Sequence, residues 1–309
     1  MKEDRVNSAK IEVEGRKLEI THPEKLLFSD PPLSKIEIVE YFLEIGPYIL
    51  PHLKDRPLTI WAHPEGIEKP GYIMKEAPQG RPEWVRTWSY YSESRGDLID
   101  WVIADDLPTL IYLVNLGCLD FHPWLSRTDL PDFPDFVVFD LDPEPEAEFR
   151  DLIQVAFLIK ELLGSAELEV YPKTSGARGL HLFLPIERNY RYEVIREFAL
   201  NISLILDFKH PELIATEWKK EKRQGKVRID YTQNSLGKTM AAVYSIRPRP
   251  GAPVSCPLTW EELEKIRNPG DYNLGKMKKR LKNKEDLFLP VLFKKQKLER
   301  AFEELKANV

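Results

Sequence analysis

One short segment constrains the fold of this chain more than any other, namely Phe136-Val-Val-Phe-Asp140-Leu-Asp142-Pro143. Its run of four apolar residues predicts a strand that is buried in the protein. Side chains alternate between the two faces of a strand, so Asp140 and Asp142 lie on one face and Leu141 on the other. A fold that buries this strand therefore holds two carboxylates close together at its end.

Strand and helix patterns alternate around this segment. In the second half we expect strands at 136–140, 167–171, 180–186, 227–231 and 239–245, and helices at 147–163, 190–206, 261–267 and 296–306. In the first half we expect strands at 10–14, 17–21, 56–62, 84–91 and 98–103, a helix that begins near Ser34, and a helix at 105–116 that stops at Gly117. This order predicts an α/β (α+β) fold in which helices flank a central mixed or antiparallel sheet.

No linker in the chain is long or flexible enough to require a domain boundary. We therefore expect a single domain over residues 1–309. It divides into an N-terminal region at 1–130, a core at 131–256 and a C-terminal helical region at 257–309.

Composition excludes several classes of protein. The 309 residues include 45 Lys and Arg against 50 Asp and Glu, a net charge of −5, so net charge cannot drive a coating of nucleic acid, although local patches can bind it. No apolar run is long enough for a membrane span, and the polar opening segment gives no secretory signal. The two cysteines, Cys118 and Cys256, cannot form a four-cysteine zinc site and favour a cytoplasmic location.

A third carboxylate occurs in Val227-Arg-Ile-Asp230-Tyr, where Asp230 faces away from Ile229. Carboxylates from two strands that converge on one point suit hard cations such as Mg²⁺ or Mn²⁺. A pair of such ions can clamp the attacking and leaving oxygens in phosphoryl transfer. The alternative is that Asp140 and Asp142 only form a solvated turn after the strand.

The segment between these acids is Lys173-Thr-Ser-Gly176-Ala-Arg178-Gly179-Leu-His181. Its two glycines allow a tight turn that brings backbone N–H groups close to an anion, while Lys173 and Arg178 add positive charge. His181 begins the next strand and can donate to a phosphate oxygen. The alternative is an ordinary hairpin followed by a histidine of the core.

These three segments, taken in order, resemble the catalytic motifs of the archaeo-eukaryotic primase superfamily. They most resemble the non-homologous end-joining polymerases, such as the polymerase domain of bacterial ligase D. The third motif runs as Ile229-Asp-Tyr-Thr-Gln233-Asn234. Flanking segments extend the resemblance over nearly the whole chain: Thr21-His-Pro-Glu-Lys25, Asp120-Phe-His122-Pro-Trp124, Ala242-Val-Tyr-Ser-Ile-Arg247 and Gly251-Ala-Pro-Val-Ser255.

The resemblance implies a role for each matching residue. Asp140, Asp142 and Asp230 would be catalytic and would hold two Mn²⁺ or Mg²⁺ ions. The nucleotide-binding set would be Lys173, Thr174, Ser175, Gly176, Arg178, Gly179, His181, Gln233 and Arg247. The 5′-phosphate across a DNA gap would contact His22, Lys25 and Lys35, which makes residues 1–130 the DNA-end-binding region. The implied activity is the addition of nucleotides, preferably ribonucleotides, to a primer 3′-hydroxyl at gaps or broken ends.

The chain departs from the family pattern where template stacking is expected. Tyr72-Ile-Met-Lys75 supplies one ring where the family has a pair, and we expect Trp61 to supply the other stacking surface beside Tyr72. The sequence ends at Val309 without a ligase or phosphoesterase module. We therefore expect a cytoplasmic, stand-alone polymerase, nucleoid-associated during repair, with a Ku-like end-binding protein and a separate DNA ligase as partners.

Two basic segments, at 219–228 and 275–282, could follow a phosphate backbone or could be solvated surface. Three other functions remain open. A haloacid-dehalogenase-type phosphatase would use Asp140 as its nucleophile, but Pro143 stands where that family places Gly or Thr. An inactive end-binding scaffold would keep the fold without the chemistry. A strand-initiating primase would share all three motifs.

Overall fold

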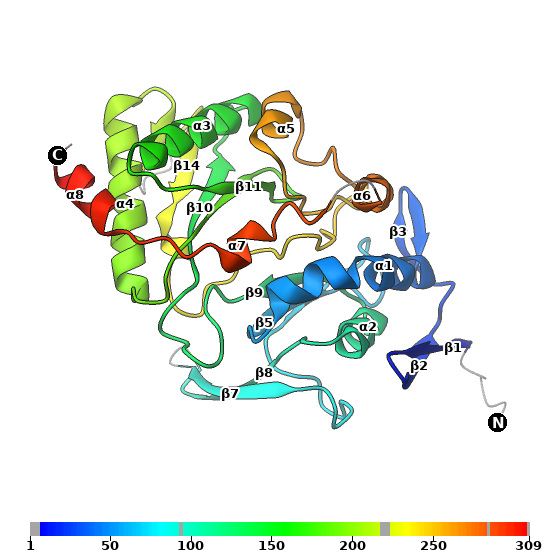
Figure 1. Ribbon diagram of the computed structural model, residues 1–309. Helices are drawn as coiled ribbons and strands as arrows, with labels where there is room; N and C mark the ends of the chain where they lie inside the picture. Colours follow the sequence, from blue (N-terminus) through cyan, green and yellow to red (C-terminus); the bar gives the residue numbers. More distant parts are fainter. Residues whose placement is uncertain (1–6, 93–94, 217–222, 283–284, 308–309) are drawn as a thin grey trace.

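The computed structural model describes residues 7–92, 95–216, 223–282 and 285–307. Its N-terminal half contains four small sheets that lie around two helices, and its C-terminal half contains a larger sheet that lies beside a second group of helices (Figure 1). None of the described helices is both long enough and apolar enough to cross a membrane.

The N-terminal half is made of β-hairpins and a three-stranded sheet in the order β6-β5-β9. Its elements are β1 (Ser8–Val13), β2 (Arg16–Thr21), β3 (Leu26–Ser29), β4 (Pro32–Ser34), α1 (Lys35–Leu53), β5 (Leu58–Ala62), β6 (Tyr72–Met74), β7 (Thr87–Ser92), β8 (Asp97–Val102), α2 (Leu107–Asn115) and β9 (Cys118–Pro123). The predicted start of α1 is confirmed, since Glu37 accepts from the backbone N–H of Ser34 at 2.8 Å. Gly117 follows α2 with a φ of +85°, as predicted.

The C-terminal half is built on a five-stranded mixed sheet in the order β11-β12-β10-β14-β13. Its elements are β10 (Phe136–Pro143), α3 (Phe149–Ser165), β11 (Tyr171–Thr174), β12 (Leu180–Pro185), α4 (Tyr192–Lys209), β13 (Ile214–Ala215), β14 (Val227–Asp230), a 3₁₀ turn η2 (Tyr231–Gln233), α5 (Trp260–Lys265), α6 (Leu274–Leu281), α7 (Pro290–Phe293) and α8 (Glu299–Ala307). The acid-bearing strand β10 lies in the middle, between β12 and β14, and α3 and α4 pack against it (Figure 1). The predicted central sheet flanked by helices is confirmed.

Two of the predicted strands are wrong, and helix α6 was not predicted. Residues 239–245 form turns rather than a strand, because Tyr244 has a φ of +69°. The backbone N–H groups of this segment donate first to carbonyls of β9 and then, at Tyr244, to the carbonyl of residue 255. The strand expected at 167–171 begins only at Tyr171, since Glu167 also has a positive φ, of +59°. The lysine-rich segment at 275–282 lies largely in helix α6, which the sequence pattern did not predict.

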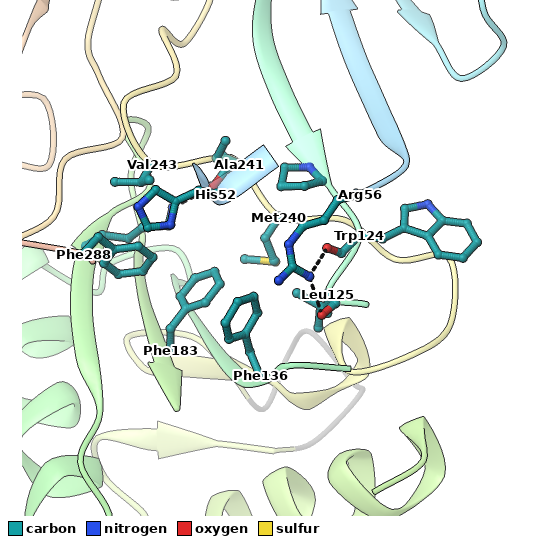
Figure 2. Close-up of a pocket in the computed structure, with 13 residues that line it drawn as sticks. His52, Arg56, Trp124, Leu125, Phe136, Phe183, Met240, Ala241, Val243 and Phe288 are labelled. Atoms are coloured by element: carbon teal, nitrogen blue, oxygen red, sulfur yellow. Dashed lines mark hydrogen bonds between the residues drawn. The ribbon is translucent and has the colours of Figure 1, made fainter. Parts of the chain in front are cut away.

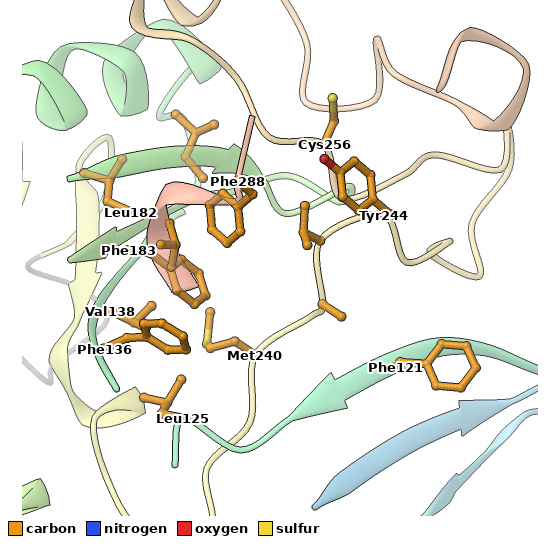
Figure 3. Packing of buried hydrophobic residues seen from close by; sticks show 14 of the residues in the cluster. Phe121, Leu125, Phe136, Val138, Leu182, Phe183, Met240, Tyr244, Cys256 and Phe288 are labelled. Atoms are coloured by element: carbon orange, nitrogen blue, oxygen red, sulfur yellow. The ribbon is translucent and has the colours of Figure 1, made fainter. Parts of the chain in front are cut away.

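An aromatic cluster joins the sheet to the C-terminal segment. The ring of Phe183 on β12 lies 5.5 Å from that of Phe136 on β10 and 5.2 Å from that of Phe288, in edge-to-face arrangements (Figure 3). Phe136 and Phe183 lie on the same face of their strands as Asp140 and His181, at alternate positions. This cluster therefore supports the acid-bearing face of the sheet from one end.

Candidate active site

The register of the central sheet brings the three predicted acids together. Strand β10 pairs with β14 so that Asp140 lies opposite Asp230 and Asp142 lies opposite Arg228. All four side chains lie on one face, because each strand contributes alternate residues. The predicted convergence of carboxylates from two strands is thus present in the sheet register.

The charge at Asp140 is poorly compensated. Burial, reinforced by the negative charges of Asp142 and Asp230, raises the pKa of Asp140 well above its usual value. Arg228 supplies a counter-charge to the other two acids, donating to Asp142 at 2.6 Å and to Asp230 at 2.9 Å. This arginine was not among the predicted site residues.

The three acids do not form a closed metal cage in this arrangement. Within the described ranges, no group of three or more His, Cys, Asp and Glu side chains is arranged to hold a metal ion. Asp230 instead bonds to Arg228 and to Thr232, whose backbone N–H and hydroxyl donate to it at 3.0 and 2.5 Å. The donor set itself fits Mg²⁺ or Mn²⁺, because it offers carboxylate oxygens whose mutual repulsion a divalent cation would relieve.

The turn at 175–179 connects β11 to β12 beside these acids. The Ser175 hydroxyl oxygen accepts from the backbone N–H groups of Ala177 and Gly179 at 3.1 and 3.0 Å. Those two amides are therefore not available to a phosphate, contrary to the prediction, but the Ser175 O–H remains a donor. Gly176 has a φ of +69°, and a Cβ there would lie 2.6 Å from Cγ of Arg247, so this position requires glycine.

His181 lies between Asp140 and Lys173. Its Nε2 is 3.3 Å from Oδ1 of Asp140, and its Nδ1 is 2.8 Å from Nζ of Lys173. Burial, followed by the charge of Lys173, holds the pKa of His181 well below its usual value, so the ring is neutral near pH 7. A neutral imidazole next to the acids can donate one hydrogen bond toward the cleft.

Lys173 and Thr174, two of the predicted nucleotide-binding residues, are buried away from the cleft. Both side chains have 0% exposure, and neither lines the cleft beside the acids. Lys173 donates to Ala241 O and Ser255 Oγ at 2.8 and 2.6 Å, and burial followed by the charge of Arg247 lowers its pKa to about 7. The two residues immediately precede the turn at 175–179, and the buried hydrogen bonds of Lys173 anchor it.

A cleft of about 500 Å³ opens in front of the acids. The residues that line it include Thr59, Trp61, Ile73, Lys75, His122, Asp140, Asp142, Ser175, Ala177, Arg178, Gly179, His181, Gln233, Gly237, Lys238, Thr239, Arg247 and Arg249. Five of these are Lys or Arg. Burial, followed by the charges of Arg247 and Arg178, lowers the pKa of Arg249, which shows that positive charge is crowded on this wall. Such a wall suits a polyanion that carries several phosphates.

Asp120 on β9 is a site residue that was not predicted. Its carboxylate is 1% exposed and lies 2.9 Å from Nε2 of His122 and 3.0 Å from Nε of Arg247. Burial alone would raise the pKa of Asp120, but the charges of His122 and Arg247 hold it below its usual value. The alternation of Asp120 and His122 across Phe121 was the sequence signal, since it places both side chains on one face of a strand.

The predicted stacking residues occupy different environments. Trp61 lines the cleft, and its ring lies 5.7 Å from that of His122. Tyr72 is 52% exposed on β6, outside the residues that line the cleft. Trp61 thus lies at the cleft, and Tyr72 lies on the open surface outside it.

The predicted 5′-phosphate contacts lie in the N-terminal half. Lys25 forms an ion pair with Glu65 at 2.6 Å, and the nearby charges of His22 and Lys35 act on the same carboxylate. Lys35 is only 5% exposed and donates to Asn115 O at 2.9 Å. Burial, followed by the charge of Lys25, lowers the pKa of Lys35. Of the two lysines, Lys25 can exchange its surface carboxylate for a phosphate, while Lys35 is buried.

The basic segment predicted at 219–228 lies partly outside the described residues, which resume at Arg223. Arg223 and Arg228 both approach Glu144, at 3.2 and 3.6 Å. In α6, Lys278 and Arg280 pair with Glu44 and Glu262. These arginines and Lys278 therefore already have acidic partners.

A second pocket, which Lys173 helps to line, is too small for a nucleotide. Its volume is about 30 Å³, enough for one or two waters, and its walls include Phe136, Phe183, Met240 and Phe288 (Figure 2). Arg56 also lines it and donates to the carbonyls of Trp124 and Leu125 at 3.3 and 2.8 Å. The pocket belongs to the core that supports the cleft.

Known proteins resemble this chain over most of its length. A family model described as "LigD, primase-polymerase domain" matches residues 34–288. The Bifunctional non-homologous end joining protein LigD of Bacillus subtilis (strain 168) is 31% identical over 268 residues, which are 86% of this chain and 43% of that protein. The Multifunctional non-homologous end joining protein LigD of Pseudomonas aeruginosa PAO1 is 31% identical over 263 residues, 85% of this chain and 31% of that protein.

A solved structure is also similar, the Polymerase Domain from Mycobacterium tuberculosis Ligase D in complex with DNA. It has a TM-score of 0.85 and 26% identity, and the match covers 90% of this chain and 99% of that one. These matches exclude the phosphatase alternative. The chain spans less than half the length of the curated relatives named above. The chain belongs to the LigD primase-polymerase domain family, a family of nucleotidyltransferases, as its three motifs predicted.

Proposed function

We propose that this chain is a DNA-repair polymerase that adds nucleotides, preferably ribonucleotides, to a primer 3′-hydroxyl at gaps and broken ends in non-homologous end joining. One observation carries the proposal: Asp140 and Asp142 open into the same cleft as Ser175, Arg178, His181 and the other cations of its wall. Acids that can hold divalent ions and cations that can hold a triphosphate thus face one space of suitable size.

Asp140, Asp142 and Asp230 would hold the two Mn²⁺ or Mg²⁺ ions, once Asp230 turns from Arg228 toward the cleft. When bound, these ions would lower the pKa of the primer hydroxyl and neutralise charge on the phosphates. The chain's own residues bind and orient the nucleotide. Ser175 and His181 donate to phosphate oxygens, and Arg178 and Arg247 neutralise the charge that develops on them.

Other contacts follow from the placement of the remaining residues. Gln233 lines the cleft and donates to Asp230 at 3.4 Å, so it would orient this acid beside the nucleotide. Trp61 would stack on a base, with Tyr72 on the approach of the template strand. Lys25 and His22, with Lys35 behind them, would receive the 5′-phosphate across the gap.

DNA with gaps, overhangs or double-strand breaks would be the macromolecular substrate, and a Ku-like end-binding protein and a DNA ligase would be the partners. The M. tuberculosis domain was solved in complex with DNA, and the curated relatives are named as end-joining proteins. We infer a cytoplasmic location, with association with the nucleoid during repair.

Primer extension on a gapped duplex with a 5′-phosphate tests this function. We expect extension that is faster with ribonucleotides than with deoxyribonucleotides and that requires Mn²⁺ or Mg²⁺. Extension by Asp140→Asn comparable to that by the wild type would overturn the proposal. An unprimed template tests the second candidate, a strand-initiating primase, because only that enzyme would form a product there.

A further inference from the structure

The hydrogen bonds of Lys173 define the protonation of its neighbours. Ala241 O can only accept, so one proton of Lys173 Nζ points to it at 2.8 Å. Thr174 O also can only accept, so the Ser255 hydroxyl donates to it at 2.8 Å. The Ser255 oxygen must then accept from Lys173 at 2.6 Å, which uses a second proton.

The third proton decides the state of His181. Lys173 and His181 are direct cross-strand partners on β11 and β12, and Nζ lies 2.8 Å from Nδ1. An ammonium has one proton left for Nδ1, which must then be the bare nitrogen. The single proton of the neutral ring is consequently on Nε2, the nitrogen that faces Asp140 at 3.3 Å.

We propose that Lys173 is a positioning residue that fixes His181 in the Nε2–H tautomer. The opposite tautomer would direct a lone pair toward the Asp140 carboxylate and toward the oxygens of any phosphate in the cleft. Only the Nε2–H form donates a hydrogen bond there, so the tautomer determines whether His181 attracts or repels the substrate. The use of this donor in catalysis rests on the proposed polymerase function, but the tautomer itself does not.

The surroundings hold the lysine in place. Backbone N–H groups of Thr174 and Cys256 bond to Cys256 O and Thr174 Oγ1 at 2.9 and 3.0 Å, which joins β11 to the segment after residue 252. Phe183 lies under the ammonium, with its ring centre 5.6 Å from Nζ. Lys173 therefore adds a charged hydrogen-bond donor to the backbone and side-chain bonds that already join the two segments.

Nitrogen NMR of histidine tests the proposal without substrate or metal. With ¹⁵N-labelled histidine, long-range ¹H–¹⁵N spectra distinguish the tautomers of the six histidines, and His181→Gln identifies the signal of His181. Below the pKa of Lys173, about 7, we expect His181 to be Nε2–H in the wild-type protein. A wild-type ring that is protonated on Nδ1 would overturn the proposal, whatever the enzyme does.

Two substitutions separate positioning from mere packing. Lys173→Met keeps the shape but has no donor, so the Nδ1–H tautomer should gain population and kcat should fall about 10²-fold with little change in KM. Lys173→Gln has an amide N–H that can donate to Nδ1, so it should restore the Nε2–H signal and part of kcat. Lys160→Met, on α3 over the ring of Trp260, is the matched control and should change neither.

The outcomes distinguish this proposal from the proposed function. If Lys173→Met folds, as shown by unchanged signals of the other histidines, and keeps the Nε2–H tautomer, the positioning role is wrong. If the tautomer changes as expected but neither the wild type nor any variant extends a primer, the positioning role stands and the polymerase function is wrong.

Discussion

Asp135 and Asp140 are both buried carboxylates, five residues apart, but the side chains around Asp135 are positively charged and those around Asp140 are mainly negatively charged. Asp135 is 1% exposed and contacts Arg56, Arg127 and Arg188 at 2.5, 3.0 and 3.2 Å. Burial would raise the pKa of Asp135, but the charges of Arg56 and Arg127 hold it below its usual value. Asp140 instead faces two further carboxylates, and its pKa is raised.

The charge of Asp135 is thus compensated within the protein, whereas the charge of Asp140 is available to a ligand. A buried acid with cationic partners contributes to stability when ionised, and its removal leaves those cations uncompensated. A buried acid among other acids destabilises the folded protein as long as no ligand neutralises it. Groups of this kind concentrate at functional sites. Substitutions at the two positions should therefore have opposite consequences.

The largest expected effect is that of Asp140→Asn on catalysis. Loss of one acid should lower the rate of primer extension by at least about 10³-fold, because charge stabilisation by bound divalent ions is worth several kcal/mol. Its free energy of unfolding without metal, measured by urea denaturation, should equal or exceed that of the wild type. A metal-free variant that is clearly less stable would mean that Asp140 is a structural acid like Asp135.

Asp135→Asn should act on stability instead. We expect the free energy of unfolding to fall by about 3–5 kcal/mol, because three arginines lose their shared buried partner. Folded variant protein should still extend a primer at low temperature. Asp132→Asn is the control, because its ion pair with Arg191 is exposed and should contribute less than about 1 kcal/mol. A similar loss in both variants would contradict the structural role.

The pH dependence of stability sharpens the same comparison. The folded-state pKa of Asp135 is lowered, so its contribution is fully present above its unfolded value of about 3.9 and is lost as pH falls through the folded value. The difference in unfolding free energy between wild type and Asp135→Asn should thus be constant near neutrality and shrink in acid. Urea denaturation at a series of pH values measures it, and a difference that grows in acid would refute the assignment.

Much of this contrast could be predicted from the sequence, but the partners of each charge could not. Two-residue periodicity placed Asp140 and Asp142 on one face, and the ordered motifs identified the family. The counter-charge of Arg228 depends on the register between β10 and β14, which local pattern does not determine. Burial of Lys173 depends on the segment at 241–256, which resembles a strand in its apolar pattern but turns across the edge of the sheet.

A substitution at Gly176 extends the comparison to the backbone. Gly176 and Gly80 have φ values of +69° and +72°, but a Cβ would meet Arg247 at Gly176 and nothing within 4 Å at Gly80. Both Ala variants should lose about 1–2 kcal/mol of stability from left-handed backbone strain, and Gly176→Ala should lose more, because its Cβ would also lie 3.0 Å from backbone atoms of Val254 and Ser255. Only Gly176→Ala should also raise KM for the nucleotide, because it displaces Arg247. Nucleotide titrations of both variants measure this, and equal KM values would show that Arg247 does not hold the triphosphate.

The smallest effect concerns the two lysines near the N-terminus, which repeat the contrast between satisfied and available charge. Lys35 is bonded to Asn115 within the protein, whereas Lys25 forms an ion pair with the exposed Glu65. Lys25→Met should reduce the preference for a 5′-phosphorylated gap by up to about tenfold, or about 1.4 kcal/mol, with affinity for the unphosphorylated gap unchanged. Binding to the two DNAs, measured by fluorescence anisotropy at one salt concentration, gives the ratio. Lys35→Met should mainly lower stability, because it leaves a buried carbonyl without its donor. An equal loss of affinity for both DNAs in Lys25→Met would show that this lysine contacts the DNA backbone rather than the terminal phosphate.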